Sequence, residues 1–371
     1  MTNVSRTWND SDRDFVTDCQ LTDPSENGEC GPISDAAFGQ PVKTLTIADD
    51  ARLGWNKREF NYQTSLQVQH QLRPGTALAV GYFHTTWGNL TVQQNTSVTA
   101  ADFDQYCVTA PADVRLGDSS GSQICGLYDI KPQKFGQVTS LITRAKHFGK
   151  PSELFHGVDI AFNSRWRNGA FLQGGVSLGR ETVDYCYANE RPELLPEYFP
   201  NANYPRNEQF CRVTSSWWNG IGSQGKILAV YPLPWGIQVS GTFKTLPGII
   251  QTANLVLTNA QVASSLGRNL SSCPAEGVCS ATVTVPLVPT GQTTSATVSG
   301  ALFDQRLNQT DLRFTKTFRY SRRRIQGILD LYNAFNNRAP QTVNSAYGPA
   351  WLTPTTLLGG RLIKFGAQID F

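Results

Sequence analysis

The chain closes with TLLGGRLIKFGAQIDF, residues 356–371, and the second half of this stretch alternates strictly between two kinds of side chain. Ile363, Phe365, Ala367, Ile369 and Phe371 are apolar or small, while the residues between them are polar or glycine. Successive side chains of a β-strand point to opposite faces, so a period of two predicts a strand with one apolar and one polar face.

The position of this strand at the end of the chain is informative too. Chains of bacterial outer-membrane β-barrels commonly stop in this way, because the last strand closes the barrel and its terminal aromatic residue lies in the interfacial girdle. We therefore expect Ile363, Phe365, Ile369 and Phe371 to belong to a barrel-closing strand that contacts outer-membrane lipid.

The composition agrees with this expectation. Only 16% of the 371 residues are charged, below the ~25% that is usual in globular proteins. The net charge of +3 is small and no basic stripe with interleaved aromatic residues is present, which argues against nucleic acid as a partner. No run approaches the ~18 apolar residues that a membrane-spanning helix needs. A soluble protein or a β-barrel remains.

Nine stretches alternate in this way, and turn-forming residues separate them. Between residues 61 and 72 one face is almost purely amide, which suits the wall of a water-filled lumen. Asn168-Gly169 is a hairpin signal. The predicted strands are 58–72, 77–93, 138–167, 172–185, 212–231, 235–250, 304–319, 323–335 and 356–371.

The connections between these stretches alternate between short and long. Short turns on one side and long loops on the other are typical of outer-membrane barrels, whose short turns are periplasmic and whose long loops are extracellular. The sequence therefore predicts an all-β, antiparallel up-and-down transmembrane β-barrel. It is incomplete, with about nine strands and long extracellular loops.

The eight cysteines fall into four close pairs, each in a polar stretch rich in proline, glycine or asparagine. No Cys-x-x-Cys knuckle of a zinc site occurs, and paired loop cysteines suit an oxidising compartment. Strands that cross a ~25 Å apolar band separate the pairs into different loops. The predicted disulfides are Cys19–Cys30, Cys107–Cys125, Cys186–Cys211 and Cys273–Cys279.

Two further stretches are specific enough to suggest a family: Leu329-Asp-Leu-Tyr332-Asn333, and Arg361-Leu-Ile-Lys364-Phe-Gly in the terminal strand. With them the chain resembles the carboxy-terminal part of a TonB-dependent outer-membrane receptor, of the type with an amino-terminal carboxypeptidase-regulatory-like domain. The resemblance covers essentially the whole chain, through residues 8–19, 60–70, 80–83, 124–129, 168–175, 266–270, 304–313, 329–333, 347–354 and 361–366.

The resemblance implies a function and several partners. It implies a plugged 22-stranded barrel that takes up a scarce large solute, with this chain supplying the last nine strands and no enzymatic activity. TonB would bind only through an amino-terminal part that this sequence lacks, and the barrel-assembly machinery would engage the last strand. The first ten residues are no secretory signal, so we expect a fragment whose beginning is missing. Residues 1–57 are expected to be an extracellular loop region and 58–371 the barrel portion.

No catalytic constellation is visible, but one acidic stretch predicts a metal site. Asp10, Asp12, Asp14 and Asp18 stand at relative positions 1, 3, 5 and 9, a spacing that lets carboxylates converge on a calcium ion. Phe15 occupies the position where such loops usually have glycine. A solvated acidic loop is the alternative, and no other cofactor is expected.

The fold and two clusters of side chains each allow more than one interpretation. The other class of protein that the strands allow is a secreted carbohydrate-binding all-β protein, although amide-only faces are hard to bury between two sheets. Arg319, Arg322, Arg323 and Arg324 favour anchoring near lipid headgroups. Trp166 and Trp235, beside short turns, are assigned to the interfacial girdle, whereas a role for Trp217 and Trp218 stays open.

Overall fold

The protein is described by a computed structural model. It describes residues 5–23, 25–34, 45–196, 204–218, 222–273, 279–287, 302–320 and 323–370. The chain divides into two compact units, Met1–Thr46 and Ile47–Phe371. The predicted division into 1–57 and 58–371 stays a prediction. Residues just after Thr46 contact other parts of the second unit. The Ala48 backbone N–H donates to the Ile142 carbonyl at 2.8 Å, and Asp50 binds His147 at 2.5 Å.

The first unit contains more than the loop that the sequence predicted. Strands β1 (Arg6–Trp8) and β2 (Cys30–Ile33) pair antiparallel, and the Cys19–Cys30 disulfide closes the segment between them. Strands of three and four residues are too short to show an alternating pattern, which is why the sequence did not reveal them.

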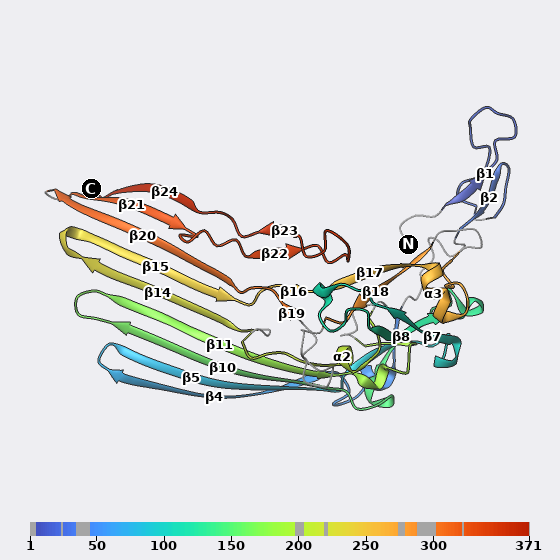
Figure 1. The fold of residues 1–371 in the computed structure, drawn as a ribbon, viewed down its shortest axis with the longest axis horizontal. Helices are drawn as coiled ribbons and strands as arrows, with labels where there is room; N and C mark the ends of the chain where they lie inside the picture. The colour runs from blue at the N-terminus through green and yellow to red at the C-terminus, as the bar shows by residue number, and fades with distance from the viewer. Residues whose placement is uncertain are drawn as a thin grey trace. The chain divides into compact units, whose positions relative to one another are not determined.

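The second unit is built on one antiparallel sheet in which nine strands follow each other in chain order, with the short β13 added beside β11. Figure 1 shows the strands side by side from β4 to β24. They are β4 (Phe60–Arg73), β5 (Thr76–Gly88), β10 (Ser152–Arg165), β11 (Phe171–Asp184), β14 (Gln224–Leu233), β15 (Ile237–Leu246), β20 (Leu307–Tyr320), β21 (Arg323–Tyr332) and β24 (Leu362–Asp370). The sheet is open, with β4 and β24 at its edges.

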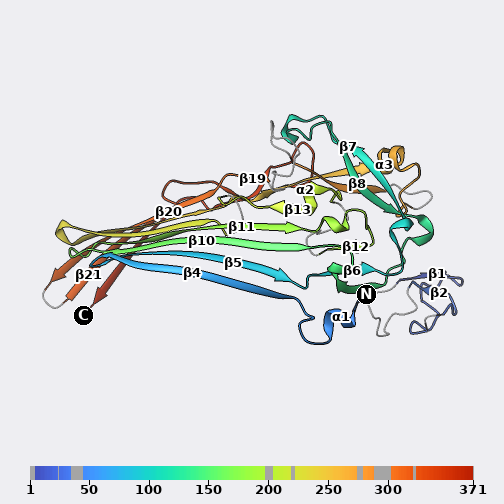
Figure 2. The same cartoon turned by 90° about the horizontal axis from the view of Figure 1, so that it is seen from below.

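Short and long connections alternate as predicted. Short turns join β4 to β5, β10 to β11, β14 to β15 and β20 to β21, and long connections join the remaining pairs. Gly75 and Gly169 have φ of 81° and 84° in two of the turns, a conformation that glycine adopts readily. The long connections gather at the end of the sheet opposite the short turns (Figure 2). The predicted all-β meander of nine strands is thus confirmed.

Several predicted strands were too long. The stretch 77–93 divides into β5 and β6 (Thr91–Asn95), 138–167 into β9 (Ser140–Arg144) and β10, and 212–231 into β13 (Arg212–Thr214) and β14. The stretch 356–371 divides at Gly359 and Gly360 into β23 (Pro354–Leu357) and β24. Alternation continues across these breaks because the short pieces are also strands, and only their partners differ. Phe371, a predicted closing residue, lies outside the described residues.

The long connections carry small elements of their own, whereas β3 (Leu45–Ile47) and α1 (Asp49–Arg52) precede β4 and η6 (Pro234–Gly236) forms the short β14–β15 turn. Among the described residues the remaining elements of the long connections are β7 (Phe103–Thr109), β8 (Gln123–Ile130), β12 (Leu194–Leu195), β16 (Ile250–Gln251), β17 (Ala253–Thr258), β18 (Ser280–Val285), β19 (Leu302–Phe303), β22 (Pro340–Val343), α2 (Glu208–Cys211), α3 (Asn259–Leu266), η1 (Ala100–Asp102), η2 (Val114–Leu116), η3 (Pro132–Lys134), η4 (Ala145–His147) and η5 (Cys186–Ala188). None of the described helices is long and apolar enough to span a membrane.

The buried cores lie among these connections. The larger core joins the β7–β8 hairpin, the β17–β18 hairpin, α3 and Trp351, so that three long connections pack together. A smaller core forms around Val92, Ala145, Tyr185 and Leu194. The loops are therefore a packed assembly, whereas the sheet keeps much of both its faces exposed.

Candidate functional surfaces of the sheet and loops

The nine-stranded sheet has one largely apolar face. Residues paired across antiparallel strands lie on the same face, and the register places Val80 opposite Ile160 and Ile160 opposite Val176. At the other edge Leu329 lies opposite Phe365. Large exposed apolar residues of this face are Leu66, Val68, Val80, Ile160, Val176, Ile227, Tyr231, Phe243, Phe318, Ile325, Ile363, Phe365 and Ile369.

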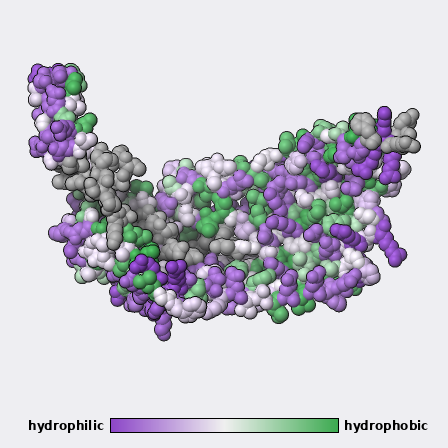
Figure 3. All heavy atoms as spheres, turned by 180° about the vertical axis from the view of Figure 1, so that it is seen from behind, coloured by the Kyte–Doolittle hydropathy of each residue, from purple (hydrophilic) through white to green (hydrophobic). Residues whose placement is uncertain are grey.

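The opposite face is mostly polar or small. Its β4 residues are the predicted amide series, which includes Gln63, Gln67, Gln69 and Gln71, all exposed. An open hollow of about 690 Å³ lies here, lined by residues of β4, β5, β10, β11, β14, β15 and β20. Figure 3, coloured by hydropathy, shows hydrophobic and hydrophilic residues interspersed on the side of the molecule seen from behind.

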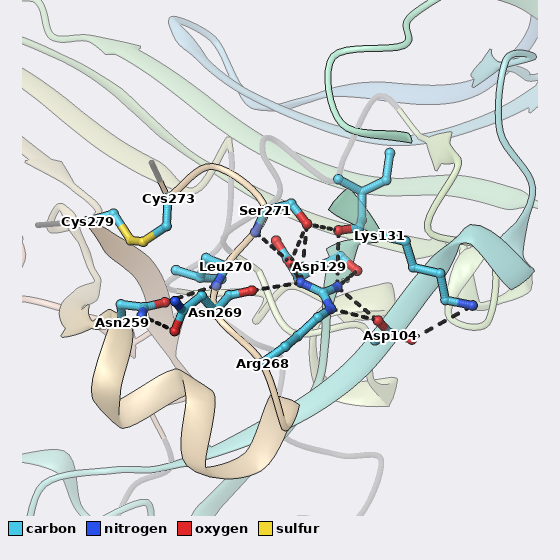
Figure 4. A network of polar contacts seen from close by, with 11 residues as sticks. Asp104, Asp129, Lys131, Asn259, Arg268, Asn269, Leu270, Ser271, Cys273 and Cys279 are labelled. Carbon is cyan, nitrogen blue, oxygen red and sulfur yellow. Dashed lines mark hydrogen bonds and ion pairs between the residues drawn. A yellow bond between two sulfur atoms is a disulfide. The ribbon is translucent and has the colours of Figure 1, made fainter. Parts of the chain in front are cut away.

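Arg268 ties two of the long connections together (Figure 4). Its guanidinium bonds Asp104 at 2.9 Å, forms an ion pair with Asp129, and donates to the Ile130 carbonyl at 3.1 Å. Burial alone lowers the pKa of Arg268, but the hydrogen bonds and charges of Asp129 and Asp104 outweigh it and the pKa is raised. Ser271 adds a backbone bond to the Asp129 carboxylate at 3.0 Å. The loop after α3 is thereby fixed on the β7–β8 hairpin.

A second set of contacts ties the connection after β21 to the same assembly. The Trp351 indole donates to the Thr252 carbonyl at 2.8 Å, and the Tyr347 hydroxyl donates to Asp113 at 2.9 Å. Arg115 bonds the same carboxylate and lies 5.3 Å from the Trp351 ring centroid. These hydrogen bonds, first of all those from Arg115, hold the pKa of Asp113 well below its usual range.

The disulfides join the pairs that the sequence predicted. The Cα–Cα separations are 5.8 Å for Cys19–Cys30 and 4.2 Å for Cys107–Cys125. They are 4.8 Å for Cys186–Cys211 and 5.5 Å for Cys273–Cys279. The last three pairs lie in three different long connections of the second unit.

The predicted calcium residues lie together in the first unit. Carboxylate oxygens of Asp12, Asp14 and Asp18 lie within 4.8 Å of one another, and so do those of Asp10, Asp12 and Glu29. Several of these carboxylates accept backbone N–H groups of the same loop, as Asp10 does from Arg13 at 2.7 Å. Arg13 and Phe15 take positive φ, 64° and 62°, so the absence of the usual glycine does not prevent the turn. Calcium binding stays a prediction.

Glu29 is the member of this cluster that the sequence did not reveal. Hydrogen bonds from the Ser11 side chain and backbone, and then from the Trp8 indole, lower the pKa of Glu29 to about 2. The pKa of Asp18 is raised, chiefly by the charge of Asp14. Glu29 follows the acidic stretch at a distance in sequence, and only the β1–β2 pairing brings it near.

Most residues of the predicted arginine and tryptophan clusters lie among the described residues. Arg324 forms an exposed ion pair with Asp370 at 3.4 Å, whereas Arg322 lies outside the described residues. Trp235 is 82% exposed in the β14–β15 turn, and Trp166 follows β10 at another short turn. Trp218, whose role the sequence left open, stacks on Arg306 with 4.0 Å between the guanidinium carbon and the ring centroid.

The histidines are closer than their sequence positions suggested. His84 and His156 are directly opposite each other on β5 and β10, with ring centroids 4.6 Å apart. His156 shares a hydrogen bond of 2.8 Å with Tyr82. The two residues are 72 positions apart in the sequence (156 minus 84), so no local pattern predicted that their rings would be in contact. His70 lies on β4 and His147 in η4.

Comparisons with known proteins return little. No protein-family model matches the chain, and no curated protein matches it. Among solved structures, the outer membrane transporter YddB from Escherichia coli is similar with a TM-score of 0.40 and 12% sequence identity. The match covers 83% of this chain and 32% of that chain, so this chain spans about a third of the transporter's length.

Proposed function

We propose that the chain is part of the wall of an outer-membrane transporter, with its apolar face against lipid and its polar face towards a lumen. The observation that carries this proposal is the register, which brings a row of exposed apolar residues from strands across the sheet to one face. Monomeric soluble proteins rarely expose apolar patches above a few hundred Å². Strands of 9 to 14 residues are also long enough for a tilted strand to cross the ~30 Å apolar core of a bilayer.

The finer proposal is a receptor of the TonB-dependent type that takes up a scarce large solute. Its support is the sequence resemblance, together with loops that pack into one assembly at a single end of the sheet. Such an assembly would present a fixed surface to the outside. TonB would be engaged by the rest of the receptor, and the last strand β24 would engage the barrel-assembly machinery. We propose no catalytic role for the chain.

The secreted carbohydrate-binding protein is less well supported. A β-sandwich packs the apolar faces of two sheets against each other. The second unit has one large sheet whose apolar residues stay exposed along its length. The other sheets among the described residues have two to four strands of at most eight residues each, too small to cover the apolar face of the large sheet.

Surface proteolysis of intact cells tests the proposal. Trypsin added to cells that make the protein should release peptides cut in the long connections, for example at Arg115, Lys134 and Arg338. Sites beside short turns, such as Arg167 and Arg323, should be cut only after the outer membrane is broken. Mass spectrometry reads both sets from the same sample. Recovery of the protein from the medium or the soluble fraction would overturn the proposal.

A further inference from the structure

Two lysines face each other on the polar side of the sheet without an acidic partner. Lys226 of β14 lies directly opposite Lys244 of β15, and both line the hollow. None of the ion pairs among the described residues involves either lysine. Like charges directly opposite each other in a sheet, with Cβ atoms ~4.5–5.5 Å apart, are destabilising. The pair thus creates a local excess of positive charge.

The acidic residue that lines the same hollow is already engaged. Asp311 accepts the Gln309 side-chain amide at 2.9 Å and the Asn333 backbone N–H at 2.7 Å. It lies opposite Thr242, not opposite a lysine. By contrast Asp330, elsewhere on the polar face, forms an ion pair with Arg313 at 2.6 Å. Asp311 and Asp330 therefore bind groups other than the two lysines.

The register explains why the hollow lies beside the lysines. One row across the sheet runs from Gln69 through Ala79, Ala161 and Gly175 to Lys226, Lys244 and Gln309. Small side chains at the centre of this row leave space next to two long cationic ones. The volume of about 690 Å³ falls within the ~300–1,000 Å³ of small-molecule sites. Asn163, Gln173 and Gln224 add neutral hydrogen-bonding groups to its lining.

We propose that this hollow binds a small solute through a phosphate group held between Lys226 and Lys244. A phosphate monoester carries a charge of about −1.5 to −2 at neutral pH, so a single group can neutralise both ammonium ions. The amides would hydrogen-bond the polar body of the solute. This inference rests on the proposed function, because it requires the polar face to line a space that solutes enter.

The test is chemical footprinting of lysines in isolated outer membranes. Reductive methylation is followed by mass spectrometry, with glucose 6-phosphate, inorganic phosphate or glucose present as probes. Glucose 6-phosphate should protect Lys226 and Lys244, at lower concentration than inorganic phosphate, and glucose should not. Lys364, which lies on the same face opposite Asp330, is the internal control and should stay reactive.

A variant makes the test sharper. Lys226→Gln should raise at least tenfold the glucose 6-phosphate concentration that half-protects Lys244, whereas Lys364→Gln should leave it unchanged. Equal protection by glucose, or protection of Lys244 that is unaltered in Lys226→Gln, would overturn the inference. If the long connections are cut on intact cells as expected but glucose 6-phosphate does not protect Lys226 and Lys244 from methylation, this inference alone is overturned. Recovery of the chain from the soluble fraction would overturn the proposed function instead.

Discussion

At the scale of single residues, Arg268 is the polar centre of the loop assembly. Its side chain is 22% exposed and the Asp129 side chain 13% exposed, so both charges are largely removed from water. Hydrogen bonds to charged groups contribute ~1.5–3 kcal/mol. Arg268 also reaches the backbone of the β7–β8 hairpin, which a shorter or apolar side chain would leave unsatisfied.

We expect Arg268→Met to destabilise the loop assembly by about 1.5–3 kcal/mol. The measurement is the rate of thermolysin cleavage within residues 247–306 under native conditions. Arg52→Met is the matched control, since Arg52 forms an ion pair with Asp49 in which both side chains are more than half exposed. Surface pairs of this kind contribute ~0–1 kcal/mol. Equal cleavage rates in the two variants would contradict the role of Arg268.

Glu29 predicts a pH dependence in the first unit. Its folded pKa of about 2 is below the ordinary value of 4.5, so its hydrogen bonds stabilise the folded form fully above pH 4.5. That contribution is lost as the pH falls from 4.5 towards 2. Hydrogen exchange of the Ser11 amide, which donates to Glu29 at 2.6 Å, should therefore accelerate over this range relative to its intrinsic rate.

The control for Glu29 is the variant Glu29→Gln, which has no carboxylate to protonate. The Ser11 amide of this variant should show no comparable change between pH 4.5 and 2. A wild-type protein whose Ser11 protection is constant over the same range would show that the carboxylate does not order this loop.

At the scale of elements, neighbouring residues of each central strand lie on opposite faces of the sheet, one on the apolar face and the next on the polar face. Ile160 lies on the apolar face of β10, paired with Val80 and Val176, and Ala161 follows on the polar face. The two positions share a strand, a depth and the neighbouring strands β5 and β11. They differ in the medium that the proposal assigns to them, which makes them a matched pair.

Lysine at Ile160 should impair membrane insertion far more than lysine at Ala161. A lysine or arginine on the lipid face near the bilayer midplane costs ~2–4 kcal/mol, whereas lumen substitutions are tolerated. The measurement is the amount of each variant in washed outer membranes relative to wild type. If Ala161→Lys is lost as severely as Ile160→Lys, the assignment of the faces is wrong.

The disulfide in the β7–β8 hairpin belongs to the same scale. Cys107 and Cys125 are separated by 18 positions and link the two strands of the hairpin. A closed loop of this length contributes ~3 kcal/mol by constraining the unfolded chain. Replacing both cysteines with serine should lower the stability of the loop assembly by about that amount in urea unfolding. Peptide mapping without reduction should recover the two cysteines in one cross-linked peptide pair. A link from either cysteine to another loop would contradict the structure.

At the scale of the whole second unit, a single open sheet is combined with a packed loop assembly. The edges β4 and β24 have partners on one side only, and exposed edges are open to pairing with another chain. A wall of a larger barrel meets this condition, because closure satisfies both edges. The two largest cores lie in the connections and not on the sheet, as expected when lipid takes the place of a protein core.

Alternation in the sequence predicted the nine strands and their two faces, because side-chain direction in a strand has a local period of two. The spacing of the cysteines predicted the disulfide partners, since the bonded cysteine is in each case the nearest one in the sequence. Gly359 and Gly360 show the limit: residues on both sides continue the pattern, yet β23 pairs with β22 and β24 with β21. Local periodicity does not specify which strand is the partner.

Only the tertiary structure decided the sites. Glu29 joins Asp10 and Asp12, Arg268 reaches Asp104 across 164 positions, and Lys226 meets Lys244 beside a hollow formed by strands far apart in sequence. Each of these contacts depends on the register between segments or on the packing of separate loops. Such contacts are set by many residues acting together, and no local pattern of side chains records them.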